Sequence, residues 1–332
     1  MGKHPVSIVG YRILRRWKKP LSALLDSLSP GLGLRKRFKF LDRFMKKLET
    51  PLSIAPLESL RASRGERFAA KVQSGSFTFK LYLSTREPVS TSPLTRDLLI
   101  DRLWEPLVTK LISQLLRPGD VVLDIGANIG YYSVLAGKIV GKRGRVFAFE
   151  PDPYTYGKLC QNVRINRLQD VVKPLEKAVG ERTSRSRLFL SGADSGDHRL
   201  FDSGEHRGSV EVACVRLDEY AMDIPQLREQ LALVKMDVQG FEVAAYRGMR
   251  ELLTHSSPAL ITEYEPCTLA AAGSSATAYV ELLRSYGYHS FAFISWDRKQ
   301  QAPLPMAYQE LLQRQCASSE HPHGYLYCRK DG

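Results

Sequence analysis

Residues 118–152 limit the fold more than any other part of the chain. Val121–Asp124 is a short apolar run of strand length, and Gly126 and Gly130 permit a tight turn directly after it. A stretch of helical composition follows, and Arg145–Phe149 forms a second apolar run. Two strands joined in this way are parallel, with a right-handed crossover. The sequence therefore predicts a parallel α/β sheet, in which ligands bind at the carboxyl ends of the strands.

The charges in this unit indicate what kind of ligand binds there. The turn reads D-x-G-x-N-x-G instead of the G-x-G-x-x-G of a dinucleotide site, and its carboxylate, Asp124, would repel a pyrophosphate. The same anion suits a cation such as the sulfonium of S-adenosylmethionine. Glu150, at the end of the second strand, can accept hydrogen bonds from both ribose hydroxyls. The unit predicts S-adenosylmethionine as the cofactor, although the glycines and Glu150 also suit a purely structural turn.

Positive charge is concentrated at the start of the chain. Residues 1–50 hold 13 Lys and Arg against three acids, a net charge of +10 out of +13 for all 332 residues. Leu, Phe and Trp are interleaved with these cations. We expect residues 1–66 to form a basic helical arm that contacts an acidic partner, most simply an anionic membrane surface, or that packs as a solvated appendage. Nucleic acid and charged glycans are the other acidic partners this arm would suit.

The cysteines and the hydropathy bear on location. None of the five cysteines forms a C-x-x-C pair, so a cysteine-based zinc site is not expected, and their scatter favours thiols in a reducing compartment. No apolar run has the length of a membrane span, and the start of the chain lacks the pattern of a signal peptide. These features predict a cytoplasmic protein, with peripheral membrane contact through the arm.

Further strands and helices follow from the periodicity of the sequence. Alternating residues over 68–84 predict a β-hairpin, and a helix is expected over 91–116, so residues 67–117 should form a block that covers the site. The domain itself should span residues 118–332 as a doubly wound sheet with an antiparallel edge. Its later strands are expected at 169–175, 187–190, 210–215, 231–236, 259–262, 289–295 and 324–328, with a long polar loop over 191–207.

Together the motifs resemble a known family, the class I S-adenosylmethionine-dependent methyltransferases of the FkbM type. The resemblance covers about residues 100–266. It implies O-methylation of a hydroxyl on a sugar, glycolipid, polysaccharide or polyketide-like molecule, and a Rossmann-like seven-stranded sheet of order 3-2-1-4-5-7-6. Gln239 departs from the family pattern, which usually has Glu there, so position 239 is a poor candidate for an essential acid. The motifs that carry the resemblance are Val122–Tyr132, Phe149–Pro153, Asn162 with Asn166, Gly196–Arg199, Val215–Asp218 and Val234–Glu242.

The expected cofactor site lies at the ends of the first three predicted strands, at residues 121–124, 145–149 and 169–175. Ala178 follows the third strand, where an adenine face could pack. The residues expected to bind the cofactor are Asp124, Gly126, Asn128, Gly130, Tyr131, Glu150, Pro151, Asp152 and Ala178.

Methyl transfer to a hydroxyl also needs a group that takes the hydroxyl proton. Asp237 follows the fourth strand and His198 lies in the polar loop, so we expect one of them to be the base and the other to orient the acceptor. Glu263, at the end of the fifth strand, is a third candidate for contact with the acceptor. Oxygen ligands at Asp237 and Glu263 would suit magnesium, but the sequence holds no dense ligand cluster, and no metal is predicted.

Structural roles compete with each of these assignments. His198 could be a loop histidine bonded to Asp194 or Asp202, and Asp237 could cap the helix that follows it. For Glu242, an acid in the first turn of a helix, the structural role is favoured.

Three other functions remain to be weighed. The basic arm raises the alternative of an RNA methyltransferase, but base methylation usually needs an Asn/Asp-Pro-Pro-aromatic turn, and the chain has Asp237-Val-Gln-Gly instead. A cofactor-binding module without catalysis is disfavoured by the intact Asp124 and Glu150, because nothing would select them if no cofactor bound. An NAD-dependent enzyme is disfavoured by the anion at the turn.

Overall fold

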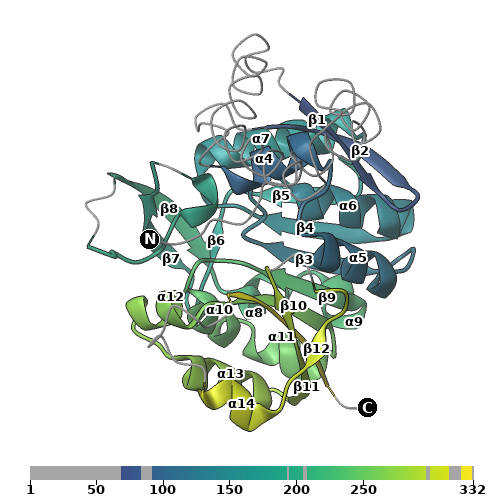
Figure 1. The fold of residues 1–332 in the computed structure, drawn as a ribbon. Helices are drawn as coiled ribbons and strands as arrows, with labels where there is room; N and C mark the ends of the chain where they lie inside the picture. Colours follow the sequence, from purple (N-terminus) through teal and green to yellow (C-terminus); the bar gives the residue numbers. More distant parts are fainter. Residues whose placement is uncertain are drawn as a thin grey trace, which may run out of the picture.

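The structure is a computed structural model that describes residues 69–83, 92–192, 194–204, 208–296, 300–313 and 323–330. A central sheet runs through the molecule, and helices cover both of its faces (Figure 1). The predicted basic arm at residues 1–66 lies outside the described residues, so the arm and the domain boundaries drawn from it stay predictions. In the part of the chain that is described, no helix is both long and apolar enough to cross a membrane.

The central sheet has eight strands in the order β12-β11-β13-β10-β9-β3-β4-β5. The pairs from β10 to β5 are parallel, while β13 lies antiparallel between β10 and β11. Counted along the chain without the two-residue edge strand β12, the order is the predicted 3-2-1-4-5-7-6. The strands are β3 (Val121–Ile125), β4 (Arg145–Phe149), β5 (Val172–Leu175), β9 (Leu231–Met236), β10 (Ala259–Tyr264), β11 (Tyr288–Ser295), β12 (Leu304–Pro305) and β13 (Gly324–Lys330).

Alternate residues of the strands enter two different cores. In β3, Val121, Leu123 and Ile125 pack into one core, and Val122 packs into the other. A strand that is buried on both faces in this way reads as one continuous apolar run, which is why its position is visible in the sequence. One core is covered by α4 (Pro93–Ile100), α5 (Pro106–Leu115), α6 (Tyr131–Val140) and α7 (Pro153–Ile165). The other is covered by α8 (Leu217–Tyr220), α9 (Pro225–Glu229), α10 (Glu242–Arg247), α11 (Arg250–His255), α12 (Pro266–Ala271), α13 (Ala276–Ser285) and α14 (Tyr308–Gln313).

The predicted hairpin is present as β1 (Ala69–Ser74) and β2 (Phe77–Tyr82). Two asparagines of α7 attach it to the domain. The side-chain amide of Asn162 exchanges two hydrogen bonds with the backbone of Tyr82, at 2.6 and 3.0 Å, and Asn166 does the same with Lys80, at 3.2 and 2.7 Å. Each amide thus imitates one residue of a neighbouring strand. The Asn162 and Asn166 motif therefore has a structural explanation.

The helix expected over 91–116 is broken. It is split into α4 and α5 because Pro106 takes the first position of α5, and Glu105 before it has a left-handed backbone. The helical segment after Asp237 is also divided, into α10 and α11 around Gly248. A Cβ at Gly248 would lie 2.0 Å from the carbonyl oxygen of Gly180. This position must therefore be glycine for the turn to pack against the backbone at Gly180.

A second, three-stranded sheet flanks the main one, in the order β6-β8-β7. It consists of β6 (Ala178–Val179), β7 (Ser184–Leu190) and β8 (Gly208–Val215), which confirms the two short strands expected here. The polar loop between β7 and β8 folds back, since Phe189 and Arg199 form a β-bridge. The cysteines follow the prediction in part: Cys160, Cys214 and Cys328 are free, but Cys267 is disulfide-bonded.

Candidate active site

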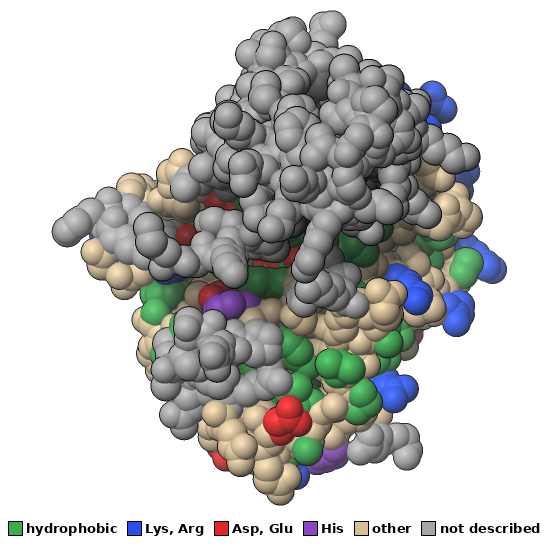
Figure 2. Space-filling model, in the orientation of Figure 1, with side chains coloured by type: hydrophobic (Ala, Val, Ile, Leu, Met, Phe, Trp, Pro, Cys, Tyr) green, Lys and Arg blue, Asp and Glu red, His purple; other side chains and the backbone are tan. Residues whose placement is uncertain are grey.

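A cavity of about 480 Å³ opens at the carboxyl ends of the central strands. Acidic side chains outnumber basic ones in its lining. On the face drawn in Figure 2, acidic and histidine side chains lie among hydrophobic ones in the middle of the molecule, while lysines and arginines lie mainly along one side. The acids that line the cavity are Asp97, Glu105, Glu150, Asp194, Asp197, Asp237 and Glu263, and the bases are Arg96, Lys177 and Lys235.

One end of the cavity is formed around Glu150, which follows β4. The backbone amide of Asn128 donates to its Oε2 at 2.8 Å, and the amide of Asp152 donates to its Oε1 at 2.9 Å. Burial raises the pKa of Glu150 to about 8, although the two amide bonds act in the opposite direction. When the group is ionised, each oxygen keeps a further acceptor position, so the carboxylate can still receive hydroxyl donors from a ligand. This geometry fits the predicted ribose contact.

Other parts of the protein lie directly against the two turn glycines. A Cβ at Gly126, where φ is +75°, would lie 1.8 Å from the carbonyl oxygen of Asp237. At Gly130 a Cβ would lie 2.5 Å from the side chain of Leu159. Gly126 lines the cavity and Gly130 does not. Gly126 can therefore still contact a ligand, while the predicted cofactor contact of Gly130 is corrected, because Gly130 makes room for the helix α7.

Asp124 does not face the cavity, which corrects its predicted role. Its side chain is 1% exposed and absent from the cavity wall. Its Oδ2 accepts from the hydroxyl of Ser133 on α6, and its Oδ1 has no hydrogen-bond partner among the described residues. Burial raises the pKa of Asp124 in spite of the nearby Lys235. Asp124 therefore lies beneath the site and meets its neighbours on β9 and α6, instead of meeting a cationic ligand directly.

The remaining predicted cofactor residues divide in the same way. Asp152 is buried and caps α7, where its carboxylate accepts from the amide of Thr155 at 2.8 Å. Its role is structural, and it does not line the cavity. The predicted residues that do line the cavity, besides Gly126 and Glu150, are Asn128, Tyr131, Pro151 and Ala178.

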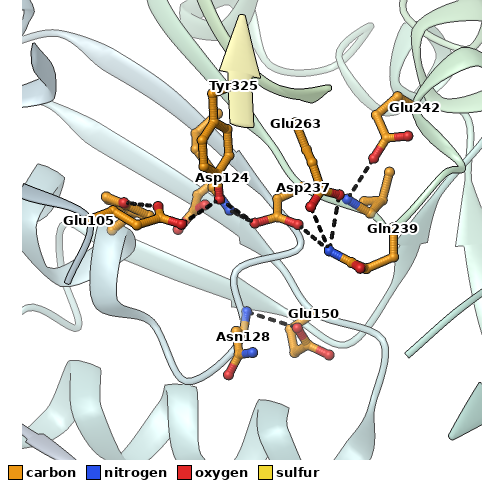
Figure 3. A network of polar contacts seen from close by, with 12 residues as sticks. Glu105, Asp124, Asn128, Glu150, Asp237, Gln239, Glu242, Glu263 and Tyr325 are labelled. Atoms are coloured by element: carbon orange, nitrogen blue, oxygen red, sulfur yellow. Dashed lines mark hydrogen bonds and ion pairs between the residues drawn. The ribbon is translucent and has the colours of Figure 1, made fainter. Parts of the chain in front are cut away.

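The other end of the cavity is formed around Asp237, which follows β9 (Figure 3). Its Oδ2 accepts from the ammonium of Lys235 at 3.1 Å and from the hydroxyl of Tyr325 at 2.9 Å, and its Oδ1 accepts from the amide of Gln239 at 2.9 Å. Burial raises the pKa of Asp237, but Lys235 and the three hydrogen bonds outweigh burial, so the pKa is lowered. Asp237 does not cap a helix, because α10 begins only at Glu242.

Lys235 is a buried cation among carboxylates. It is 4% exposed, and its ammonium lies 5.3 Å from the ring centre of Tyr132. Burial lowers the pKa of Lys235, but Asp237, Asp124 and Glu105 together raise it above its usual value. In the sequence, Lys235 stands out as the single charge within an otherwise apolar strand, but no role was predicted for it.

Gln239 holds two carboxyl groups together. Its amide nitrogen donates to Asp237 Oδ1 and also to both oxygens of Glu263, at 2.9 and 3.0 Å. Glu263 is 2% exposed, and burial, followed by the nearby Asp237, raises its pKa well above the usual range. Asp237, with a lowered pKa, and Glu263, with a raised pKa, thus lie side by side, and the amide at position 239 joins them. Among the described residues, no cluster of His, Cys, Asp and Glu is arranged to hold a metal.

His198 lines the cavity from the loop that follows β7. The backbone amide of Ser191 donates to its Nδ1 at 3.0 Å. In a neutral ring this bond places the proton on Nε2, so the ring is set to donate from Nε2 and not to accept there. Glu242 has the structural role that was favoured: it is buried in the first turn of α10 and accepts from the amides of Val238 and Gly240.

Glu105 is the functional candidate that the sequence did not reveal. It lies at the break between α4 and α5, where its φ is +38°, and its side chain lines the cavity. The hydroxyls of Tyr132 and Tyr325 donate to its two oxygens. Burial raises the pKa of Glu105 to about 7, against the effect of the Tyr132 bond. Pro106 marks the break in the sequence and could have revealed it. Glu105, Asn128 and Gln239 are non-glycine residues with positive φ, and all three line the cavity.

A family profile described as "Methyltransferase FkbM domain" matches residues 124–290, half of the chain. The chain belongs to the FkbM methyltransferase family. The resemblance predicted from the motifs is thereby confirmed, and so is methyltransferase activity at the level of the family. Members of this family take the methyl group from S-adenosylmethionine, so this cofactor is confirmed as well.

Similar proteins include methyltransferases that act on different acceptors. The hexuronic acid methyltransferase AglP of Haloferax volcanii is 28% identical over 149 residues, 44% of this chain and 56% of that protein. The tRNA (guanine(37)-N(1))-methyltransferase of Schizosaccharomyces pombe is 39% identical over 118 residues, 35% of this chain and 25% of that protein. The structure of a methyltransferase FkbM from Methylobacillus flagellatus has 17% identity and a TM-score of 0.39, and covers 65% of this chain and 45% of that one. The matched region is thus about half or less of each of these proteins.

Proposed function

We propose that the protein is an O-methyltransferase whose acceptor is a hydroxyl group of a sugar or glycan. The observation that supports this is the lining of the cavity, where the described residues include seven acids and three bases. Three of the acids, Glu105, Glu150 and Glu263, have raised pKa values, but the other four still outnumber the bases. Such a lining suits a cationic methyl donor better than a polyanion. A hydroxyl acceptor is neutral, and it can lose its proton to one of these acids during the transfer.

Asp237 is the base in this proposal. An ionised carboxylate has about four acceptor positions, and the bonds from Lys235, Tyr325 and Gln239 occupy three of them. The fourth position is left for the acceptor hydroxyl. Since Asp237 is ionised and lines the cavity, it can take this proton as the new bond forms.

His198 and Glu263 orient the acceptor. The Ser191 bond leaves the His198 proton on Nε2, from which it can donate to a sugar oxygen. Burial raises the pKa of Glu263, so its carboxyl group, when protonated, can also donate to a sugar oxygen. Of the two candidates for the base, the geometry therefore favours Asp237, and His198 takes the orienting role.

The cofactor, when bound, supplies a methyl carbon on a positively charged sulfur. Glu150 would bind its ribose, and Tyr131, Pro151 and Ala178 would line the space for the rest of it. The acceptor end would then hold the hydroxyl at reacting distance while Asp237 removes its proton. Two of the similar proteins act on hexuronic acid and on tRNA, and both acceptor classes belong in the test.

The test supplies methyl-labelled S-adenosylmethionine with three acceptors: neutral glycans, hexuronic acid glycans and tRNA. We expect the label in a methyl ether on a sugar, which resists mild alkali. Label in an alkali-labile methyl ester would show transfer to the carboxylate of the hexuronic acid instead. Label in tRNA alone would overturn the proposal in favour of the nucleic-acid alternative.

The residue roles are tested by Asp237→Asn. This variant should bind S-adenosylmethionine within about twofold of the wild type by calorimetry and lose about 10²–10⁴-fold in kcat, since general base catalysis contributes that much. Glu211→Gln is the matched control, because Glu211 is an exposed acid on β8. Full turnover in Asp237→Asn would remove Asp237 from the role of base.

A further inference from the structure

Glu105 and Asp237 are joined by a single hydroxyl group. The OH of Tyr325 lies 2.9 Å from Asp237 Oδ2 and 3.0 Å from Glu105 Oε1. Both distances are those of hydrogen bonds, but one phenol has only one proton to donate. The hydroxyl therefore lies between two carboxyl groups and can donate to either of them, while its oxygen accepts from the other when that one is protonated.

All three groups lie at the same end of the cavity, and they come from distant parts of the chain (Figure 3). Tyr325 is 2% exposed on β13, so its ring is held by the core and its hydroxyl cannot turn away to solvent. The hydroxyl of Tyr132 donates to the second oxygen of Glu105 and fixes the other side of that carboxylate. The arrangement is a continuous path from the proposed base into the wall of the cavity.

We propose that the proton of the acceptor hydroxyl ends on Glu105, to which it passes from Asp237 through the hydroxyl of Tyr325. This inference rests on the proposed function, because it assigns a destination to the proton that Asp237 removes. Glu105 is a positioning residue in this scheme, since it acts through Tyr325 and not on the acceptor itself.

The transfer balances in atoms and charge. With the cofactor bound, the acceptor oxygen would form a bond to the methyl carbon with its lone pair, and the sulfur would keep the electron pair of the broken carbon–sulfur bond and lose its positive charge. The acceptor O–H proton goes to Asp237. Asp237 then gives a proton to the oxygen of Tyr325, and Tyr325 gives its own proton to Oε1 of Glu105. Asp237 is again ionised, Tyr325 is unchanged and Glu105 is neutral.

The surroundings favour this direction. Lys235 lies 3.1 Å from Asp237 and stabilises the ionised form of that carboxylate, so the pKa of Asp237 is lowered. Glu105 has no cation at such a distance among the described residues, and burial raises its pKa to about 7. A proton shared by the two groups therefore moves to Glu105. The other groups that act on Glu105 are Tyr131, Tyr132, Tyr325 and Lys235.

The pH dependence of turnover follows with a definite sign. Only ionised Glu105 can receive the proton, so kcat should be low below pH 7 and should rise as pH increases through about 7. In Glu105→Gln this acid limb should disappear, and kcat should fall about 10²-fold at pH 8. In Tyr325→Phe, Glu105 is intact but cut off from Asp237, so kcat should fall similarly at pH 8 and the acid limb should again disappear.

Three controls separate a relay from a structural effect. Tyr327→Phe removes a hydroxyl from the same strand without touching the path, and it should keep both kcat and the acid limb. Tyr132→Phe removes a bond that favours ionised Glu105, so its acid limb should move to higher pH. All variants should bind S-adenosylmethionine within about twofold of the wild type by calorimetry.

A second readout needs no acceptor. Infrared difference spectra of the wild type, titrated around pH 7, should show a carboxylic acid C=O band that is absent in Glu105→Gln and shifted in Tyr325→Phe. Full kcat with the acid limb intact in Glu105→Gln, or no such band in the wild type, would overturn the relay. If the wild type methylates no hydroxyl at all, the proposed function fails, and the infrared titration still reports whether Glu105 and Tyr325 are coupled.

Discussion

The two ends of the cavity are built in opposite ways. At the Glu150 end, backbone amides of residues 128 and 152 hold the carboxylate, and all the residues involved lie close together in the sequence. At the Asp237 end, side chains hold one another, and the bond from Tyr325 to Glu105 joins residues 220 positions apart. The first end is a local motif, and the second exists only once the sheet has been assembled.

This structural difference matches the proposed functions of the two ends, which are cofactor binding at Glu150 and acceptor binding at Asp237. A cofactor shared by a whole family can be bound by a turn that recurs with the fold, because amides are present whatever the side chains are. An acceptor and its proton need particular side chains with particular charges. We therefore expect changes at the Asp237 end to alter stability and turnover, and changes at the Glu150 end to alter cofactor affinity.

The largest effect is expected from Lys235→Met. It leaves Asp124, Asp237 and Glu105 without their buried cation, and removal of one partner of a buried pair costs about 3–5 kcal/mol. Chemical denaturation measures this loss. The double variant Lys235→Met/Asp237→Leu should recover part of it, because both charges are then gone. Lys173→Met, an exposed lysine on β5, is the control. Equal stability of Lys235→Met and the wild type would show that the acceptor end does not depend on this charge.

A smaller effect, on affinity, is expected from Glu150→Gln. The amide cannot accept the same set of donors, and a hydrogen bond to a charged group is worth about 1.5–3 kcal/mol. The Kd for S-adenosylmethionine should rise about tenfold to hundredfold by calorimetry. Glu229→Gln, at an exposed position on α9, should leave it unchanged. An unchanged Kd in Glu150→Gln would place the ribose elsewhere.

The smallest effect is expected from Asn166→Ala, at neither end of the cavity. The change leaves the backbone of Lys80 without two partners and should lower the free energy of unfolding by about 1–2 kcal/mol. Hydrogen exchange at the amides of β2 should become faster, while cofactor affinity stays the same. Gln161→Ala, an exposed position on the same helix, gives the reference. A large loss of cofactor affinity in Asn166→Ala would mean that cofactor binding at the Glu150 end depends on this hairpin contact.

The sequence predicted the fold well, for physical reasons. Strands buried on both faces leave apolar runs, so their positions could be predicted, while their order came from the resemblance to the family. Glu150 could be singled out because it follows such a run. Asp124 was placed wrongly, because a sequence shows which residue precedes a turn but not which way its side chain points. The roles of Glu105, Lys235 and Tyr325 depend on contacts between distant strands and helices, which no local pattern encodes.

The hairpin has a consequence for how the two ends keep their spacing. Asn162 and Asn166 fasten β2 to α7, the helix that begins beside Glu150. From β1, the amide of Gln73 donates to the carbonyl of Arg102 at 3.1 Å, three residues before Glu105. The hairpin thus acts as a strut between the helix at one end and the bend that carries Glu105 at the other. In a relative without the hairpin, another element would have to hold this bend in place. Otherwise Glu105 would move out of hydrogen-bond distance of Tyr325.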